Sequence, residues 1–170
     1  MTKNRLIQRL AWYYPAELGG LRFFVGLLLY QVLRLGVANG LFLLYGLLVV
    51  IFVLYQGQRY WKLKLWRLQG REFDEAHHLR FFTVAKQANK VLILLMPVVL
   101  VGQWIWAGGN FGPNNTLLWA LLANTFGILE HVNCYHRQLS IDNAYDIAYL
   151  RRNRRLKIAS LAKDLREGKL

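Results

Sequence analysis

Four apolar stretches constrain the fold of this chain more than any other feature of its sequence. They run from Leu21 to Val37, from Leu41 to Tyr55, from Val91 to Ala107 and from Thr116 to Leu129. A composition of 55% hydrophobic and 14% aromatic residues is too apolar for an ordinary soluble domain of 170 residues. The sequence therefore predicts an all-α integral membrane protein in which four transmembrane helices form two hairpins.

Each stretch is shorter than the roughly 20 residues that cross a hydrocarbon layer about 30 Å thick. Aromatic side chains that favour the headgroup level extend the stretches at their ends, at Tyr55, Tyr60, Trp61, Trp66, Trp104, Trp106 and Trp119. The first stretch is interrupted by Arg22 and Arg34 and could instead lie in the interface. We expect it to cross, because two arginines near opposite ends can extend to opposite headgroup layers.

The positions of the charges predict the orientation. Lysine and arginine total 22 against 9 acidic residues, a formal charge of +13. The two connections expected outside, 38–40 and 108–115, carry no charge, and every basic residue except Arg34 falls on the other side. This asymmetry predicts cytoplasmic termini in a bacterial cytoplasmic or thylakoid-type membrane, with the anionic inner leaflet as a partner. Because topology explains the net charge, nucleic acid is not an expected partner.

The same patterns divide the chain into five segments. The cytoplasmic hairpin among them is expected to reverse at Gln69-Gly70, and the tail to begin a helix at Ser140, Asp142 and Asn143. The segments are a basic amphipathic helix at 1–16 that ends at Pro15, a first transmembrane hairpin at 17–56, a cytoplasmic helical hairpin at 57–90, a second transmembrane hairpin at 91–130 and a basic cytoplasmic helical tail at 131–170.

A possible metal site lies where the fourth stretch ends. Glu130 and Cys134 are four residues apart and His131 and Cys134 are three apart, so each pair shares a helix face. A complete site needs a further ligand from the cytoplasmic hairpin, which offers His77, His78, Asp74 and Glu75, and His77 is the first candidate. The alternative is that Glu130 and His131 are ordinary polar residues at a membrane exit. Haem or chlorophyll could be held by His131 only as a single axial ligand, and no cofactor is predicted.

A basic cluster is the clearest candidate surface. Next to an anionic leaflet each of its side chains can contribute about 1 kcal/mol. The cluster can bind lipid or a partner protein, or it can serve topology alone. Its members are Arg151, Arg152, Arg154, Arg155 and Lys157. Within the stretches, Gln103 and Asn124 are expected to bond across the bundle.

The stretch 131–143, HVNCYHRQLSIDN, and the stretch 156–165, LKIASLAKDL, resemble a group of small uncharacterised bacterial membrane proteins, some of them labelled general stress proteins. The resemblance covers about the last quarter of the chain and implies neither an activity nor a site. Cys134 stands where an aromatic residue is expected in that group, which argues against thiol chemistry.

These features predict a non-enzymatic accessory subunit, assembly factor or scaffold of a larger membrane complex, since no catalytic motif is present. Other subunits or further copies of the chain would be its protein partners. One alternative is a metal- or cofactor-binding redox protein of the membrane. Another is a small oligomeric channel lined by Gln31, Gln103 and Asn124.

Overall fold

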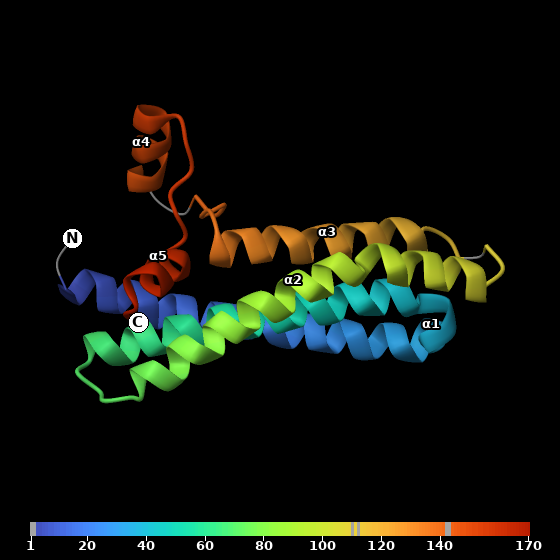
Figure 1. Cartoon of the computed structure of the whole chain (residues 1–170), viewed down its shortest axis with the longest axis horizontal. Coiled ribbons are helices and arrows are strands. Elements are labelled where there is room, and N and C mark those ends of the chain that lie inside the picture. The colour runs from blue at the N-terminus through green and yellow to red at the C-terminus, as the bar shows by residue number, and fades with distance from the viewer. Residues whose placement is uncertain (1–2, 110, 112, 142–143) are drawn as a thin grey trace.

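The computed structural model describes residues 3–109, 111, 113–141 and 144–170, and these residues form helices without a strand. Three helices, α1, α2 and α3, run side by side along the long axis, and α4 projects sideways near one end (Figure 1). The all-α prediction is confirmed. The helices are α1 Lys3–Leu68, α2 Glu75–Trp106, α3 Thr116–Tyr135, α4 Ala144–Asn153 and α5 Ser160–Glu167.

The longest helix, α1, folds back on itself at Gly36. This glycine has φ 69° and ψ 170°, a conformation that side-chain-bearing residues rarely adopt. The two halves then lie antiparallel (Figure 1), and the rings of Tyr13 and Trp61 stack with centroids 6.1 Å apart. The outer turn expected at 38–40 therefore begins two residues earlier, at the glycine that can adopt the reversal.

By length and composition, two helices among the described residues could cross a membrane, within Leu10–Leu68 and within Glu75–Trp106. The sequence predicted four crossings. The number of such helices is lower than the number of predicted crossings partly because the first two predicted crossings are the two halves of the single helix α1. It differs also because α3 has only 20 residues and ends in the polar sequence around Glu130, His131 and Asn133.

The predicted end of the first helix at Pro15 is wrong. Helix α1 continues through this proline. A proline removes the hydrogen bond to the carbonyl four residues earlier, here that of Ala11. Ala11 and Pro15 both lie on the exposed side of the helix, so solvent can satisfy the freed carbonyl. The apolar residues that follow Pro15 then keep the chain helical.

The bundle has two different ends. At the distal end lie the reversal at Gly36 and the connection between α2 and α3, of which residues 110 and 112 are outside the described residues (Figure 1). At the charged end, Gly70 with φ 73° reverses the chain between α1 and α2. The Asp74 side chain caps α2 by accepting from the backbone N–H of His77 at 2.9 Å. Both described ends of the chain lie at this charged end.

Two buried amides join the helices near the distal end. Gln103 of α2 accepts from the backbone N–H of Phe42 at 2.6 Å and donates to the carbonyl of Asn39 at 2.8 Å. Asn124 of α3 donates to the carbonyl of Phe42 at 2.9 Å. Gln103 thus binds two backbone groups of α1 just beyond the reversal at Gly36. The predicted bonds across the bundle are confirmed.

A second buried group joins the same three helices nearer the charged end. Gln56 of α1 and Asn89 of α2 exchange two side-chain hydrogen bonds, at 3.0 and 2.8 Å. The Tyr135 hydroxyl of α3 donates to the Gln56 carbonyl oxygen at 2.6 Å. Gln56 and Asn89 are fully buried and Tyr135 is 1% exposed. We call these three residues the amide node.

Beyond α3 the chain builds a narrow neck that carries α4. The backbone N–H of Gln138 donates to Lys157 and that of Ala159 to His136, so two short segments run antiparallel. Helix α4 projects from this neck, away from the bundle (Figure 1). Of the residues expected to begin this helix, Asp142 and Asn143 lie outside the described residues.

Helix α5 returns to the bundle and completes a core at the charged end. This core is separate from the apolar core around Leu47 and Val53 that fills the rest of the bundle. It joins residues of α1, α2, α3 and the C-terminal segment, so the charged end is a packed unit. Its buried members are Tyr60, Leu63, Phe82, Tyr135, Leu161 and Leu170.

Close approach of α1 and α3 depends on Gly46. A Cβ atom at this position would lie 2.5 Å from Nδ2 and 2.9 Å from the backbone nitrogen of Asn124. We therefore expect Gly46→Ala to lower the free energy of unfolding by about 1–3 kcal/mol, the usual cost of overpacking. Thermal unfolding in mild detergent, followed by tryptophan fluorescence, measures the change.

The matched control is Gly102→Ala in α2, where a Cβ atom meets no atom within 4 Å. Alanine favours a helix over glycine by about 1 kcal/mol, so this control should be neutral or stabilising. Equal effects of the two substitutions would contradict the close packing of α1 on α3.

Candidate binding cavity at the charged end

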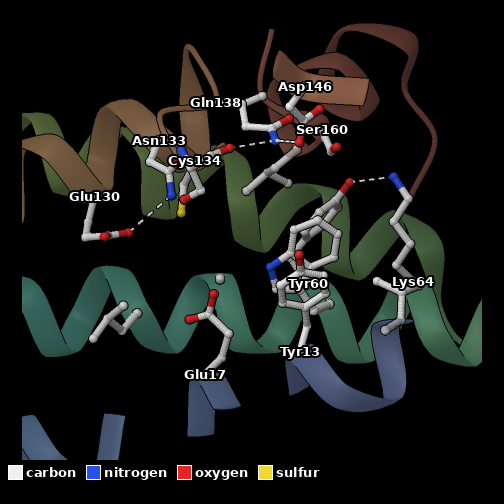
Figure 2. Close-up of a pocket in the computed structure, with 17 residues that line it drawn as sticks. Tyr13, Glu17, Tyr60, Lys64, Glu130, Asn133, Cys134, Gln138, Asp146 and Ser160 are labelled. Atoms are coloured by element: carbon white, nitrogen blue, oxygen red, sulfur yellow. Dashed lines mark hydrogen bonds between the residues drawn. The ribbon is translucent and has the colours of Figure 1, made fainter. Parts of the chain in front are cut away.

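A cavity of about 360 Å³ lies at the charged end, between the two halves of α1, the end of α3 and the segment that follows it (Figure 2). Ligand pockets commonly measure about 300–1,000 Å³, so this volume suits a small ligand or one part of a larger one. Most of its polar lining comes from residues far apart in the sequence: Tyr13, Glu17, Tyr60, Lys64, Glu130, Asn133, Cys134, Gln138, Ser140, Asp146 and Ser160.

One side of the cavity is closed by an ion pair between α1 and α5. The Asp164 carboxylate accepts from Lys64 Nζ at 2.9 Å and from the Tyr60 hydroxyl at 2.6 Å. Burial and then the bond to Asp164 raise the pKa of Tyr60, so its hydroxyl remains protonated and donates. This contact holds α5 on α1.

A second ion pair closes the cavity toward α4. Asp146 accepts from Lys157 Nζ at 2.6 Å and from the side-chain amide of Gln138 at 3.1 Å. Asn133 supports the adjoining chain, because its side-chain oxygen accepts from the backbone N–H of Leu139 at 2.8 Å. These bonds fix the neck and therefore the wall that it contributes.

Two further carboxylates, Glu17 of α1 and Glu130 of α3, point toward the cavity from opposite sides (Figure 2). The Glu130 carboxylate accepts from Asn133 Nδ2 at 3.4 Å, which is long for a charged acceptor. Beside them, the rings of Tyr13, Tyr60 and Trp61 form one continuous aromatic wall, since Trp61 contacts both tyrosines.

The structure does not assemble the four predicted metal ligands. Cys134 lines the cavity, with Sγ only 3.7 Å from where a Cβ atom of Gly57 would lie. His131 lies on another face of α3, its ring beside that of Tyr135 at 5.2 Å. His77 is exposed on α2. Among the described residues, no three His, Cys, Asp or Glu side chains lie close enough to hold a metal ion.

Electrostatics at Cys134 also disfavour metal binding or nucleophilic chemistry by this residue, because both need the thiolate. Burial, then the Glu130 and Glu17 carboxylates, raise the pKa of the Cys134 thiol, which keeps it from forming a thiolate. Burial, then the nearby His136, lower the pKa of His131 to about 4, so this ring is neutral near pH 7. Its Nδ1 atom is buried without a hydrogen-bond partner among the described residues.

The predicted basic cluster is divided by the neck. Arg151 and Arg152 end α4, Arg154 follows with φ 50°, and these three and Arg155 are exposed. Lys157 instead pairs with Asp146 and lies 5.1 Å from the ring centre of Tyr149. The exposed surface is therefore made by four arginines at the tip of the α4 arm, the segment 144–155.

Comparisons with family models, curated proteins and solved structures found no match to this chain. The arrangement of its residues is therefore the basis on which a function can be assigned.

Proposed function

We propose that this chain crosses a bacterial membrane four times, with the charged end in the cytoplasm. Support comes from the two reversals at the distal end, because neither 38–40 nor 108–115 carries a charge. The exposed apolar face of α2 supports the same arrangement, since Leu94, Val98 and Ile105 are each more than 60% exposed and fit a lipid environment.

The single native cysteine makes the topology easy to test. In a Cys134→Ser background, Asn114→Cys places a thiol at the distal end and Arg152→Cys places one at the charged end. We expect a membrane-impermeant maleimide to label the first variant in cells with a permeabilised outer membrane, and the second only after the inner membrane is broken. Labelling of Arg152→Cys before lysis would contradict a cytoplasmic charged end.

Within this membrane we propose a non-enzymatic role, as an accessory subunit or scaffold of a larger complex. The observation that carries the proposal is the α4 arm. Its four arginines are exposed, and so is Ile147 at 45%. A cationic surface with apolar side chains, held off the bundle, suits a contact with something outside the chain.

The contacts inside the bundle support a scaffold role. The buried amides join helices to one another, and the two ion pairs at the cavity fix α5 and the neck. The interior thus supplies a stiff base for the α4 arm. Gln103 and Asn124 make bonds inside the bundle, so they would not line a channel in this conformation.

Isolation in mild detergent, followed by native mass measurement, tests this role. We expect a stoichiometric complex with other membrane proteins, and we expect Arg151→Gln with Arg152→Gln to remove most of the partner. The control, Arg71→Gln with Arg80→Gln, makes the same change of charge at exposed positions elsewhere and should leave the complex intact. A chain that is isolated alone, without any partner, would contradict the proposal.

A further inference from the structure

The cavity at the charged end has an acidic character that is unusual in this chain. The protein carries 22 basic and 9 acidic residues, yet three carboxylates and one ammonium group are found among the described residues that line the cavity. The carboxylates belong to Glu17, Glu130 and Asp146, and the ammonium group to Lys64. Asp146 is compensated by its ion pair with Lys157, so the lining carboxylate that can act on a ligand is Glu130.

The lining cation is already neutralised. Lys64 Nζ lies 2.9 Å from an Asp164 oxygen and 2.7 Å from the Tyr60 hydroxyl, so its donors point toward these two groups. A phosphate or carboxylate ligand would have to compete with Asp164. Glu130, in contrast, has among the described residues only the long 3.4 Å bond from Asn133, on one of its oxygens. Its other oxygen can accept from a ligand.

The aromatic and apolar side chains that line the cavity indicate which kind of cation it can bind. Tyr13 and Trp61 supply aromatic faces, which attract organic ammonium groups, whereas the Tyr60 ring already has Lys64 Nζ 5.1 Å from its centre. Leu10, Leu54 and Gly57 supply an apolar side at the same cavity. A bare metal ion would need several oxygen or sulfur ligands close together, and the described residues offer no such group.

We propose that this cavity binds the ammonium group of an alkylamine. Glu130 accepts hydrogen bonds from the ammonium group. The aromatic wall packs against the methylene groups of the alkylamine, and the apolar side of the cavity accommodates a chain attached to it. Two sources share this chemistry: the ethanolamine headgroup of a membrane phospholipid, and a water-soluble amine. This inference does not need a partner complex, so it can stand or fall independently of the scaffold role.

Native mass spectrometry of the full chain in mild detergent tests the inference with defined probes. The first comparison uses two phospholipids with identical acyl chains, one with an ethanolamine and one with a glycerol headgroup. The second comparison adds free ethanolamine or spermidine as a competitor. Preference for the ethanolamine lipid without competition identifies a bilayer lipid as the source, whereas efficient competition identifies a soluble amine.

Substitution of Glu130 links the binding to this cavity. Loss of a charged hydrogen bond costs about 1.5–3 kcal/mol, so Glu130→Gln should weaken binding of the ethanolamine probe roughly tenfold to a hundredfold. Glu130→Asp keeps the charge and should retain part of the affinity. The control Glu72→Gln removes an exposed carboxylate elsewhere and should have no effect.

Thermal unfolding of each variant in the absence of probe shows whether the fold is kept. Equal binding of both headgroups by the wild-type chain, with no displacement by free ethanolamine or spermidine, would overturn the inference. So would an unchanged affinity in a folded Glu130→Gln variant.

Discussion

The amide node is the interaction on which the rest of this structure depends. Gln56 is fully buried, and its side chain has partners on both atoms: its nitrogen donates to Phe52 and Asn89, and its oxygen accepts from Asn89 and Tyr135. Gln56, Asn89 and Tyr135 belong to α1, α2 and α3. Moving any of these three helices would leave polar groups unpaired in an apolar interior, at a cost of about 1–3 kcal/mol each. The node therefore fixes α1, α2 and α3 in one register, which apolar packing alone specifies less sharply.

The register set by the node has consequences at the charged end. Tyr135 belongs both to the node and to the core that α5 completes, so α3 ends at a fixed place relative to Tyr60 and Leu161. Glu130 lies one helical turn before Cys134, and both therefore face the second half of α1. The cavity lies between the end of α3 and the second half of α1, and α5 and the neck close its remaining sides.

Much of the fold could be predicted from hydropathy and glycine positions. The helical class, the reversal at Gly70 and the bonding of Gln103 and Asn124 across the bundle follow from apolar runs that are interrupted by single polar residues. The continuation through Pro15 could not be predicted, because it depends on which side of α1 is exposed. The reversal at Gly36 lies slightly before the predicted turn, because sequence alone does not show which glycine adopts a positive φ.

The candidate site was much less predictable. Spacing along α3 places Glu130, His131 and Cys134 on neighbouring faces, but the sequence does not show which elements pack against each face. Cys134 faces the cavity beside Gly57, while His131 packs beside Tyr135. Glu17, Lys64 and Asp146 come from three distant segments, and no local pattern joins them. The one signal in the sequence is the scarcity of acidic residues, which makes each of their positions informative.

A double-mutant cycle at Gln56 and Asn89 tests the importance of the node most directly. The free energy of unfolding in mixed micelles would be measured for the wild type, Gln56→Leu, Asn89→Leu and the double variant. Each single substitution should cost about 1–3 kcal/mol, because it leaves the partner amide unpaired. The double variant should cost less than the sum of the two by about 0.5 kcal/mol or more. Additive costs would show that the two amides do not depend on each other, and would contradict the central role of the node in holding the three helices together.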